Sequence, residues 1–254
     1  MFFKRWRRRQ IGNRKFPDHW LEILQKDVPP YRRLSAEDQS ELQRHILIFL
    51  NEKRFEGCGG LLMTDQIRVV IAAQACMLLL HRKTDYYPGL TTILVYPRAF
   101  IAHRINRLAS GVVIEDGEVL LGESWEHGSI VLSWDDVKHG AADIGDGHNV
   151  VFHEFAHQID SSRGRGDDSI VLCDSSSFIA WARTLQKDYE KLRQDTASNR
   201  QTLLNKYGAT NPAEFFAVAT EFFFEKPKEL KQVHPELYAE LKNFYQQDPV
   251  DYSY

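Results

Sequence analysis

The stretch "NVVFHEFAHQID" (149–160) holds two histidines four positions apart, with a glutamate directly after the first. On an α-helix this spacing puts His153 and His157 on one face, one turn apart, where both imidazoles can bind one metal ion. Glu154 can then reach a water molecule on that ion without being a ligand. The alternative is an ordinary buried helix whose histidines bond to backbone carbonyls. Because burying two imidazoles and a carboxylate without partners is costly, the stretch predicts a metal-dependent hydrolytic site.

A catalytic zinc ion needs a third protein ligand, with the fourth position left for water. Position 160 is Asp160 and position 163 is Arg163, which excludes the H-E-x-x-H-x-x-G-x-x-H pattern with its third histidine. We therefore expect a carboxylate from another helix. The stretch "NPAEFFAVATEFFFEKP" (211–227) carries Glu214 and Glu221, which are seven residues apart and share one helix face. The local sequence does not decide between Glu214 and Glu221 as the third ligand.

Two further residues are candidates for supporting roles. Asp160 lies three residues after His157 and can accept the second N–H of a ligating histidine, which fixes its tautomer. The alternative for Asp160 is a solvated acid at the end of a helix. Tyr207 precedes the ligand helix and can donate a hydrogen bond to a developing oxyanion. A lone tyrosine is more often a packing residue, so packing is the alternative for Tyr207.

Charge is distributed unevenly along this chain of 254 residues. The first fifteen, "MFFKRWRRRQIGNRK", hold seven basic residues and no acidic one, whereas the net charge of the whole chain is −3. The remainder therefore carries −10. A basic end of this kind can touch nucleic acid or an anionic surface, but a solvated tail is the simpler expectation, and we expect no direct contact with nucleic acid.

The sequence favours the cytoplasm. No apolar segment follows the N-terminal charges as it would in a signal peptide. The longest apolar stretch, residues 69–80, is too short to span a bilayer and contains Gln74. Three cysteines without C-x-x-C spacing (Cys58, Cys76 and Cys173) indicate neither a disulfide framework nor a cysteine-based zinc site.

Cap residues predict two helices in the first third of the chain. Ser35 and Asp38 form a capping-box pattern for a helix that ends near Lys53. Thr64 caps a second helix, whose almost continuous apolar character through Leu80 predicts that it is buried. Further helices are expected near 149–160, 175–192, 211–225 and 235–246.

Strands are expected in the middle of the chain. The β-branched residues of 91–97 predict one strand, and residues 128–134, "GSIVLSW", predict another. Asp116 and Gly117 join two apolar runs within 111–122, which predicts a hairpin. The strand over 128–134 precedes the histidine helix, and either a substrate-binding edge strand or an internal strand fits its sequence.

Helices first, strands next and helices last predict an α+β fold with a small mixed sheet. We divide the chain into a basic N-terminal tail (1–15), a helical N-terminal region (16–90) and a catalytic region (91–254), the last two forming one compact unit.

Two motifs together resemble the Mlc titration factor A family of bacterial zinc metallopeptidases. They are "FHEFAHQID" (152–160) and "YGATNPAEFFAVATEFFFEKP" (207–227). The similarity extends to residues 52–80, to "VYP" at 95–97 and to "GESW" at 122–125, so it covers nearly the whole chain. The catalytic half is also similar to the C-terminal protease domain of anthrax lethal factor, in which a tyrosine-glycine segment likewise precedes an "AEFFA" helix.

The resemblance implies a zincin-like core of the gluzincin type with one Zn²⁺ per chain. It makes His153 and His157 zinc ligands and Glu154 the general base. Matching "AEFFA" residue by residue selects Glu214 as the third ligand. The same match implies that Tyr207 stabilises the oxyanion.

The resemblance also implies two activities. One is aminopeptidase-type hydrolysis of peptides. The other is binding of Mlc, the repressor of the glucose phosphotransferase genes, which relieves repression. A regulatory protein that titrates a transcription factor and uses its metal mainly for structure is the alternative.

Overall fold

The computed structural model describes residues 2–98, 100–107, 113–120, 122–125, 128–162 and 175–252. The helices are α1 (Phe2–Gly12), α2 (Asp18–Asp27), η1 (Pro29–Arg33), α3 (Ala36–Glu52), α4 (Asp65–Met77), α5 (Trp134–Ala142), α6 (Val150–Ser162), α7 (Ser175–Ala197), η2 (Lys206–Ala209), α8 (Pro212–Glu225), α9 (Pro227–Val233), α10 (Pro235–Tyr245) and η3 (Pro249–Asp251). The strands are β1 (Arg54–Gly57), β2 (Thr92–Tyr96), β3 (Phe100–Arg107), β4 (Val113–Leu120), β5 (Gly122–Trp125) and β6 (Ser129–Ser133).

The two capped helices of the N-terminal region form as predicted. The Ser35 side chain accepts a hydrogen bond from the backbone N–H of Asp38 at 3.0 Å and starts α3. Thr64 accepts from the N–H of Ile67 and starts α4. Nearly all of α4 is buried, and the helix ends at Met77, slightly before the predicted end.

The basic N-terminus is a docked helix rather than the solvated tail expected over residues 1–15. α1 packs on α3. The Arg8 side chain is buried, where its guanidinium bonds to the carboxylates of Glu52 and Asp85, and Ile11 joins the core. Both acidic partners lie far along the sequence, so nothing local to the N-terminus indicates that Arg8 is anchored.

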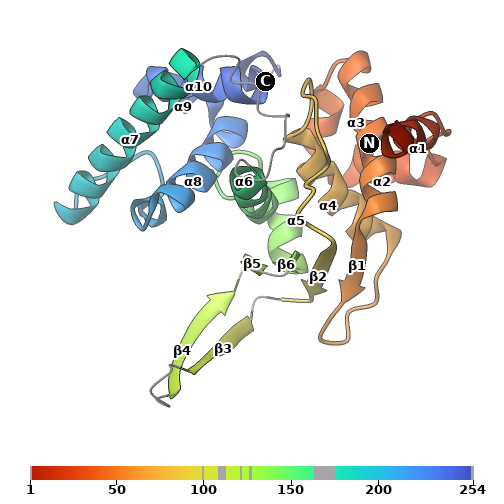
Figure 1. Cartoon of the computed structure of the whole chain (residues 1–254), viewed down its shortest axis with the longest axis horizontal. Helices are drawn as coiled ribbons and strands as arrows, with labels where there is room; N and C mark the ends of the chain where they lie inside the picture. Colours follow the sequence, from red (N-terminus) through yellow and green to blue (C-terminus); the bar gives the residue numbers. More distant parts are fainter. Residues whose placement is uncertain are drawn as a thin grey trace.

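A four-stranded sheet with the order β1-β2-β6-β5 lies below the helices in the view of Figure 1, with β1 on the side of the N-terminal helices and β5 toward the C-terminal ones. β1, β2 and β6 are parallel, and β5 pairs antiparallel with β6. This mixture of helices and a small sheet agrees with the α+β prediction. β6, predicted over 128–134, is paired on both sides and is an internal strand, while β5 lies at the edge.

The predicted hairpin at Asp116 and Gly117 is wrong. Both residues lie inside the continuous strand β4, where they pair with Arg104 and His103 of β3. β3 offers β4 eight paired positions, and a turn at Asp116 would break that ladder in its middle. The connection between the two strands spans 108–112, outside the described residues. Figure 1 shows this two-stranded ribbon extending away from the helices.

One continuous hydrophobic core joins the N-terminal helices to the C-terminal ones. Phe49 of α3 contacts Phe155 of α6, with ring centroids 5.7 Å apart. Further on, Phe216 of α8 packs edge-on against Phe244 of α10, which stacks on Trp181 of α7. Because the core is continuous, the boundary at residue 90 between the helical N-terminal region and the catalytic region remains a proposal about function. Within the described residues, no helix is both long and apolar enough to cross a membrane.

Candidate metal centre

Asn149 fixes the start of α6, the helix that carries both histidines. Its side-chain oxygen accepts from the N–H of Phe152 at 3.0 Å, which caps the helix. Its amide nitrogen donates to Gln74 of α4 at 2.9 Å and to the Gly140 carbonyl of α5 at 3.0 Å. These bonds tie the start of α6 to two neighbouring helices.

α8 starts in a similar way and packs beside α6. The side chain of Asn211 accepts from the N–H groups of Ala213 and Glu214, and Pro212 occupies the first helical position, where its missing N–H costs nothing. These contacts place Glu214 in the first turn of α8, close to the histidines of α6.

Three potential ligand atoms converge between the two helices. The Nε2 atoms of His153 and His157 are 3.2 Å apart, and Glu214 Oε2 lies 2.9 Å from the first and 3.3 Å from the second. A tetrahedral ion with ligand bonds of about 2.0–2.1 Å separates its ligand atoms by about 3.3–3.4 Å. The three side chains therefore fit a zinc-sized ion with little adjustment.

Glu221, the other candidate for the third ligand, meets the opposite side of the imidazole. Its Oε1 lies 2.7 Å from His153 Nδ1, and its Oε2 accepts the backbone N–H of Asn149 at 2.7 Å. Glu221 is almost completely buried. The seven-residue spacing from Glu214 indicates that both carboxylates face α6, but it does not indicate which ring nitrogen each one reaches.

Glu154 lies in an environment that weakens it as an acid. Its side chain points into the protein and the residue is 4% exposed. Burial raises the pKa of Glu154 to about 7, although the charges of His153 and His157 oppose the shift. Within the described residues, its Oε2 atom has no hydrogen-bond partner. A carboxyl group with a pKa near neutrality can take up and release a proton in one reaction cycle.

The candidate ligand side chains His153 and Glu214 carry opposite charges in the absence of a metal. Burial lowers the pKa of His153, but the hydrogen bonds that its ring donates to Glu214 and Glu221 outweigh this effect and raise the pKa to about 10. Burial raises the pKa of Glu214, whereas His153 and His157 lower it to about 2. A bound cation would take the place of the proton on His153.

Tyr207 lies beside the candidate metal ligands. Its ring centroid is 5.9 Å from that of His153, and the residue is 55% exposed. Gly208 makes this position possible, because a Cβ there would lie 3.2 Å from Leu192 Cδ2 and 3.3 Å from Val218 Cβ. η2 can therefore lie close against α8 and carry Tyr207 to the site.

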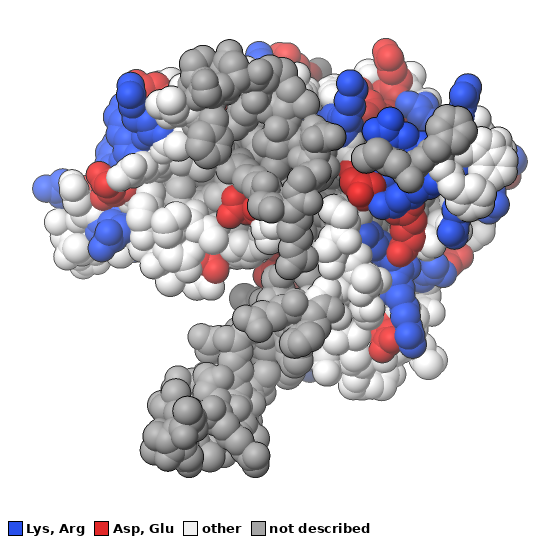
Figure 2. All heavy atoms as spheres, viewed as in Figure 1, with Lys and Arg blue, Asp and Glu red and all other residues white. Residues whose placement is uncertain are grey.

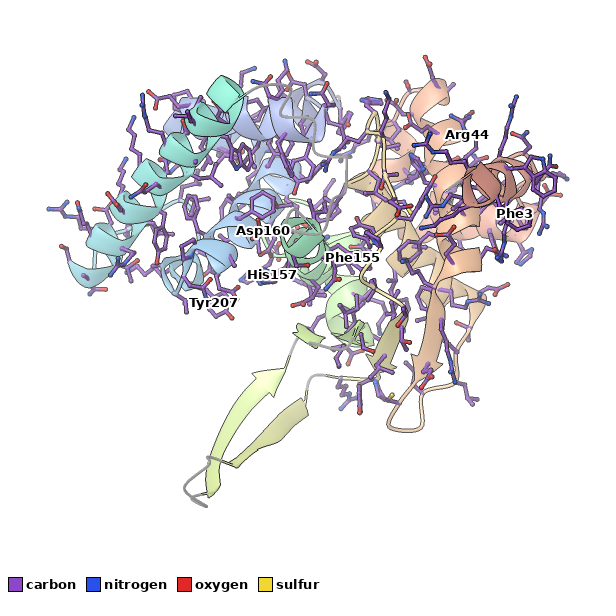
Figure 3. The ribbon with its side chains drawn as sticks, in the orientation of Figure 1. Phe3, Arg44, Phe155, His157, Asp160 and Tyr207 are labelled. Carbon is purple, nitrogen blue, oxygen red and sulfur yellow. The ribbon has the colours of Figure 1, made fainter. Side chains whose placement is uncertain are left out.

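Asp160 lies on α6 three residues after His157 and is half-buried. Figure 3 shows both residues on this helix, with Tyr207 on the segment that leads into α8. The contact of Asp160 with a ligating histidine remains a prediction.

Three groups of potential metal ligands occur among the described residues: His153, His157 and Glu214; Asp38, Glu41 and His81; and His139, Asp143 and Asp146. The second and third groups each contain exposed side chains, and acidic clusters on a surface are common without an ion. The first group has no exposed member and lies between two packed helices.

Residues 3–246 match the sequence model of the family described as glucose-regulated metallo-peptidase M90. The chain belongs to this family. Membership of M90 confirms the resemblance to the Mlc titration factor A family and implies a metal-dependent peptidase. The convergence of His153, His157 and Glu214 agrees with this class of protein.

Relatives of this M90 chain are similar over most of their length. An uncharacterized protein of Synechocystis sp. is 41% identical over 246 residues, 96% of this chain and 90% of the relative. Mlc titration factor A of Serratia proteamaculans is 33% identical over 222 residues, 85% and 84% of the two chains. Mlc titration factor A of Klebsiella pneumoniae is 29% identical over 243 residues, 95% and 89% of the two.

Proposed function

We propose that this protein is a zinc-dependent aminopeptidase-type enzyme of the gluzincin class with a zincin-like core. In this proposal, His153, His157 and Glu214 hold one zinc ion. The convergence of their three ligand atoms at separations of 2.9–3.3 Å carries the proposal, since these distances fit tetrahedral coordination. When bound, zinc supplies a Lewis acid that polarises a carbonyl and acidifies water.

The protein's own residues then move the protons and stabilise charge. Glu154 accepts a proton from the attacking water and passes it to the leaving amine, a task suited to its pKa near 7. Tyr207 donates its hydroxyl proton in a hydrogen bond to the oxyanion that develops on the carbonyl oxygen. Glu221 holds His153 in the orientation that presents Nε2 to the metal. Asp160 is the corresponding candidate near His157.

The sheet offers a place for a peptide substrate. β5 is the edge strand and packs beside α6, so an extended peptide can add to the sheet next to the histidines. The backbone hydrogen bonds of the added strand would then position the scissile bond.

The decisive experiment is the substitution Glu154→Gln. We expect it to abolish hydrolysis of aminoacyl p-nitroanilides while the zinc content, measured by mass spectrometry of the purified protein, stays near one ion per chain. Glu229→Gln, on the exposed side of α9, is the matched control and should leave activity unchanged. Full activity in Glu154→Gln would refute the mechanism.

The names of two relatives favour a second activity. Because the Serratia and Klebsiella proteins are called Mlc titration factor A, we also propose that this protein binds the Mlc repressor in the cytoplasm and relieves repression of glucose phosphotransferase genes. The alternative is that it acts as a regulatory binding protein alone, with a structural metal.

Purified Mlc on operator DNA separates these possibilities. If Glu154→Gln releases Mlc from the operator as well as the wild type does, binding is independent of hydrolysis. If the wild-type protein neither binds nor releases Mlc, the regulatory proposal fails and the peptidase proposal stands.

A further inference from the structure

An aromatic pair projects from α1 into solvent. Phe3 is 74% and Trp6 is 54% exposed, and their ring centroids lie 5.9 Å apart. Residues three apart lie on the same face of a helix, so the two rings form one apolar surface. Figure 3 shows Phe3 at the outer edge of the molecule, on the side away from α7 and α8.

The opposite face of α1 is held firmly by the N-terminal region. Arg8 bonds to the carboxylates of Glu52 and Asp85. Lys4 Nζ lies 2.9 Å from Asp85 Oδ1, and Arg7 donates to the Asn51 side chain at 3.0 Å. The helix is therefore already formed and oriented, which leaves the aromatic pair directed outward.

Arginines border the aromatic pair. Arg5 and Arg9 are exposed and lie four residues apart, one turn along the helix. Neither has an ion-pair partner among the described residues, although Lys4 and Arg8 on the docked face are both paired. Figure 2 shows basic side chains gathered around this end of the molecule. The positive charge is local, since the rest of the chain is net negative.

An exposed aromatic pair beside unpaired arginines is the chemistry of a helix that lies at a membrane interface. Phenylalanine and tryptophan insert at the level of the headgroups, and arginines bind lipid phosphates in an anionic leaflet. We propose that α1 docks this protein on anionic phospholipid surfaces, with Phe3 and Trp6 inserted and Arg5 and Arg9 on the phosphates. A nucleic acid duplex would contact the arginines alone and would leave both aromatic rings in water, so it accounts for less of this surface than a membrane does.

Vesicle sedimentation of the full-length protein tests the proposal. We expect binding to vesicles that contain phosphatidylglycerol, little binding to vesicles of phosphatidylcholine alone, and release as the salt concentration rises. The double substitution Phe3→Ser with Trp6→Ser should lower the partition coefficient about tenfold or more. Arg5→Glu with Arg9→Glu should lower it about thirtyfold on anionic vesicles.

Matched control variants show whether vesicle binding depends on α1 or on exposed apolar and charged residues in general. Leu62→Ser with Val233→Ser removes two other exposed apolar side chains, and Arg183→Glu with Lys191→Glu reverses two charges on α7. Both pairs should bind vesicles like the wild type. All of these positions are exposed, and unchanged thermal unfolding will verify that each variant is folded.

Tryptophan fluorescence gives a second measurement. Brominated lipids should quench the wild-type emission, and Trp6→Phe should remove that part of the quenching. The proposal is overturned if the wild type fails to bind anionic vesicles, or if the aromatic double variant binds as tightly as the wild type. It is also overturned if the arginine variant loses affinity for duplex DNA but not for vesicles.

Discussion

Two glutamates of one helix contact opposite nitrogens of the same imidazole. Glu214 reaches His153 Nε2 and Glu221 reaches His153 Nδ1. A histidine bound in this way has one tautomer and one ring orientation when Nε2 binds a metal. A buried carboxylate at Nδ1 would also make the ring a stronger metal ligand, and changing Glu221 tests this effect while the three proposed ligands stay unaltered.

Glu221→Gln should weaken zinc binding about 10- to 100-fold, because the amide keeps the shape but removes the charge that orients His153. Competition with a chromogenic chelator measures the affinity. Glu240→Gln on α10 is the control, and circular dichroism will show whether the fold is retained. An unchanged zinc affinity would mean that Glu221 does not support the metal site.

Tyr207→Phe should lower kcat about a hundredfold and leave KM and zinc content nearly unchanged, since the hydroxyl would act on the developing oxyanion and not on the bound substrate. Steady-state kinetics with an aminoacyl p-nitroanilide give both constants. A rise in KM at constant kcat would assign Tyr207 to substrate binding instead.

The short helix η2 depends on a glycine for its place against α8. A methyl group at residue 208 would press on Leu192 and Val218. Because Tyr207 is the adjacent residue, any outward shift of η2 moves the phenol away from the histidines. The packing of one turn of helix thus determines where a proposed catalytic hydroxyl lies.

Gly208→Ala should lower kcat about tenfold while zinc stays bound, because displacing a catalytic group by a fraction of an ångström is costly. The same kinetic assay and metal analysis apply. Gly145→Ala is the matched control, since the nearest atom to its added Cβ is Asp143 Oδ1 at 3.8 Å. Equal activity in the two variants would show that η2 tolerates the methyl group.

Elements with a local signal are predictable from the sequence. The caps at Ser35 and Thr64 start helices where expected, and the four-residue spacing of His153 and His157 correctly predicts a helix. β1 carries no comparable signal, because it is defined by pairing with β2, which follows it after the whole of α4.

Contacts between distant residues account for what the sequence does not reveal. The anchoring of Arg8 requires Glu52 and Asp85 to be brought together by the fold. Glu221 reaches His153 Nδ1 only through the relative rotation of α6 and α8, which no pattern within either helix specifies.

At the scale of the whole molecule, His81 connects the N-terminal helices to the C-terminal end of α10. Its backbone has a left-handed φ of 62°. Its Nε2 lies 2.6 Å from Asp38 Oδ1, and its Nδ1 lies 2.9 Å from the Gln246 carbonyl oxygen. Both ring nitrogens therefore face acceptors, an arrangement that favours the doubly protonated, positively charged imidazole.

Stability should consequently depend on pH. Burial lowers the pKa of His81, but the bonds to Asp38 and the Gln246 carbonyl outweigh it, so the pKa is raised. The stabilisation that follows from a raised histidine pKa is fully present below the unfolded pKa of about 6.5. It is lost as the pH rises through the folded pKa. We expect the urea concentration at the unfolding midpoint to fall as the pH rises from the unfolded pKa of His81 to its folded pKa.

His81→Asn should flatten that part of the profile, because asparagine tolerates a left-handed backbone but does not titrate. Urea denaturation at a series of pH values gives the measurement, with the exposed His19→Asn as control. If both variants retain the wild-type slope, His81 is not the titrating group.

The order of the elements along the chain also determines when the site can exist. α6 carries two of the proposed ligands, but the third is on α8, whose aromatic face packs on Phe244 and Tyr245 of α10. A ribosome makes the chain from its N-terminus, and a segment folds once its partners have emerged. The sheet and the N-terminal helices therefore emerge before the three proposed ligands can meet, and α8 gains its aromatic packing partners only once α10 has been made.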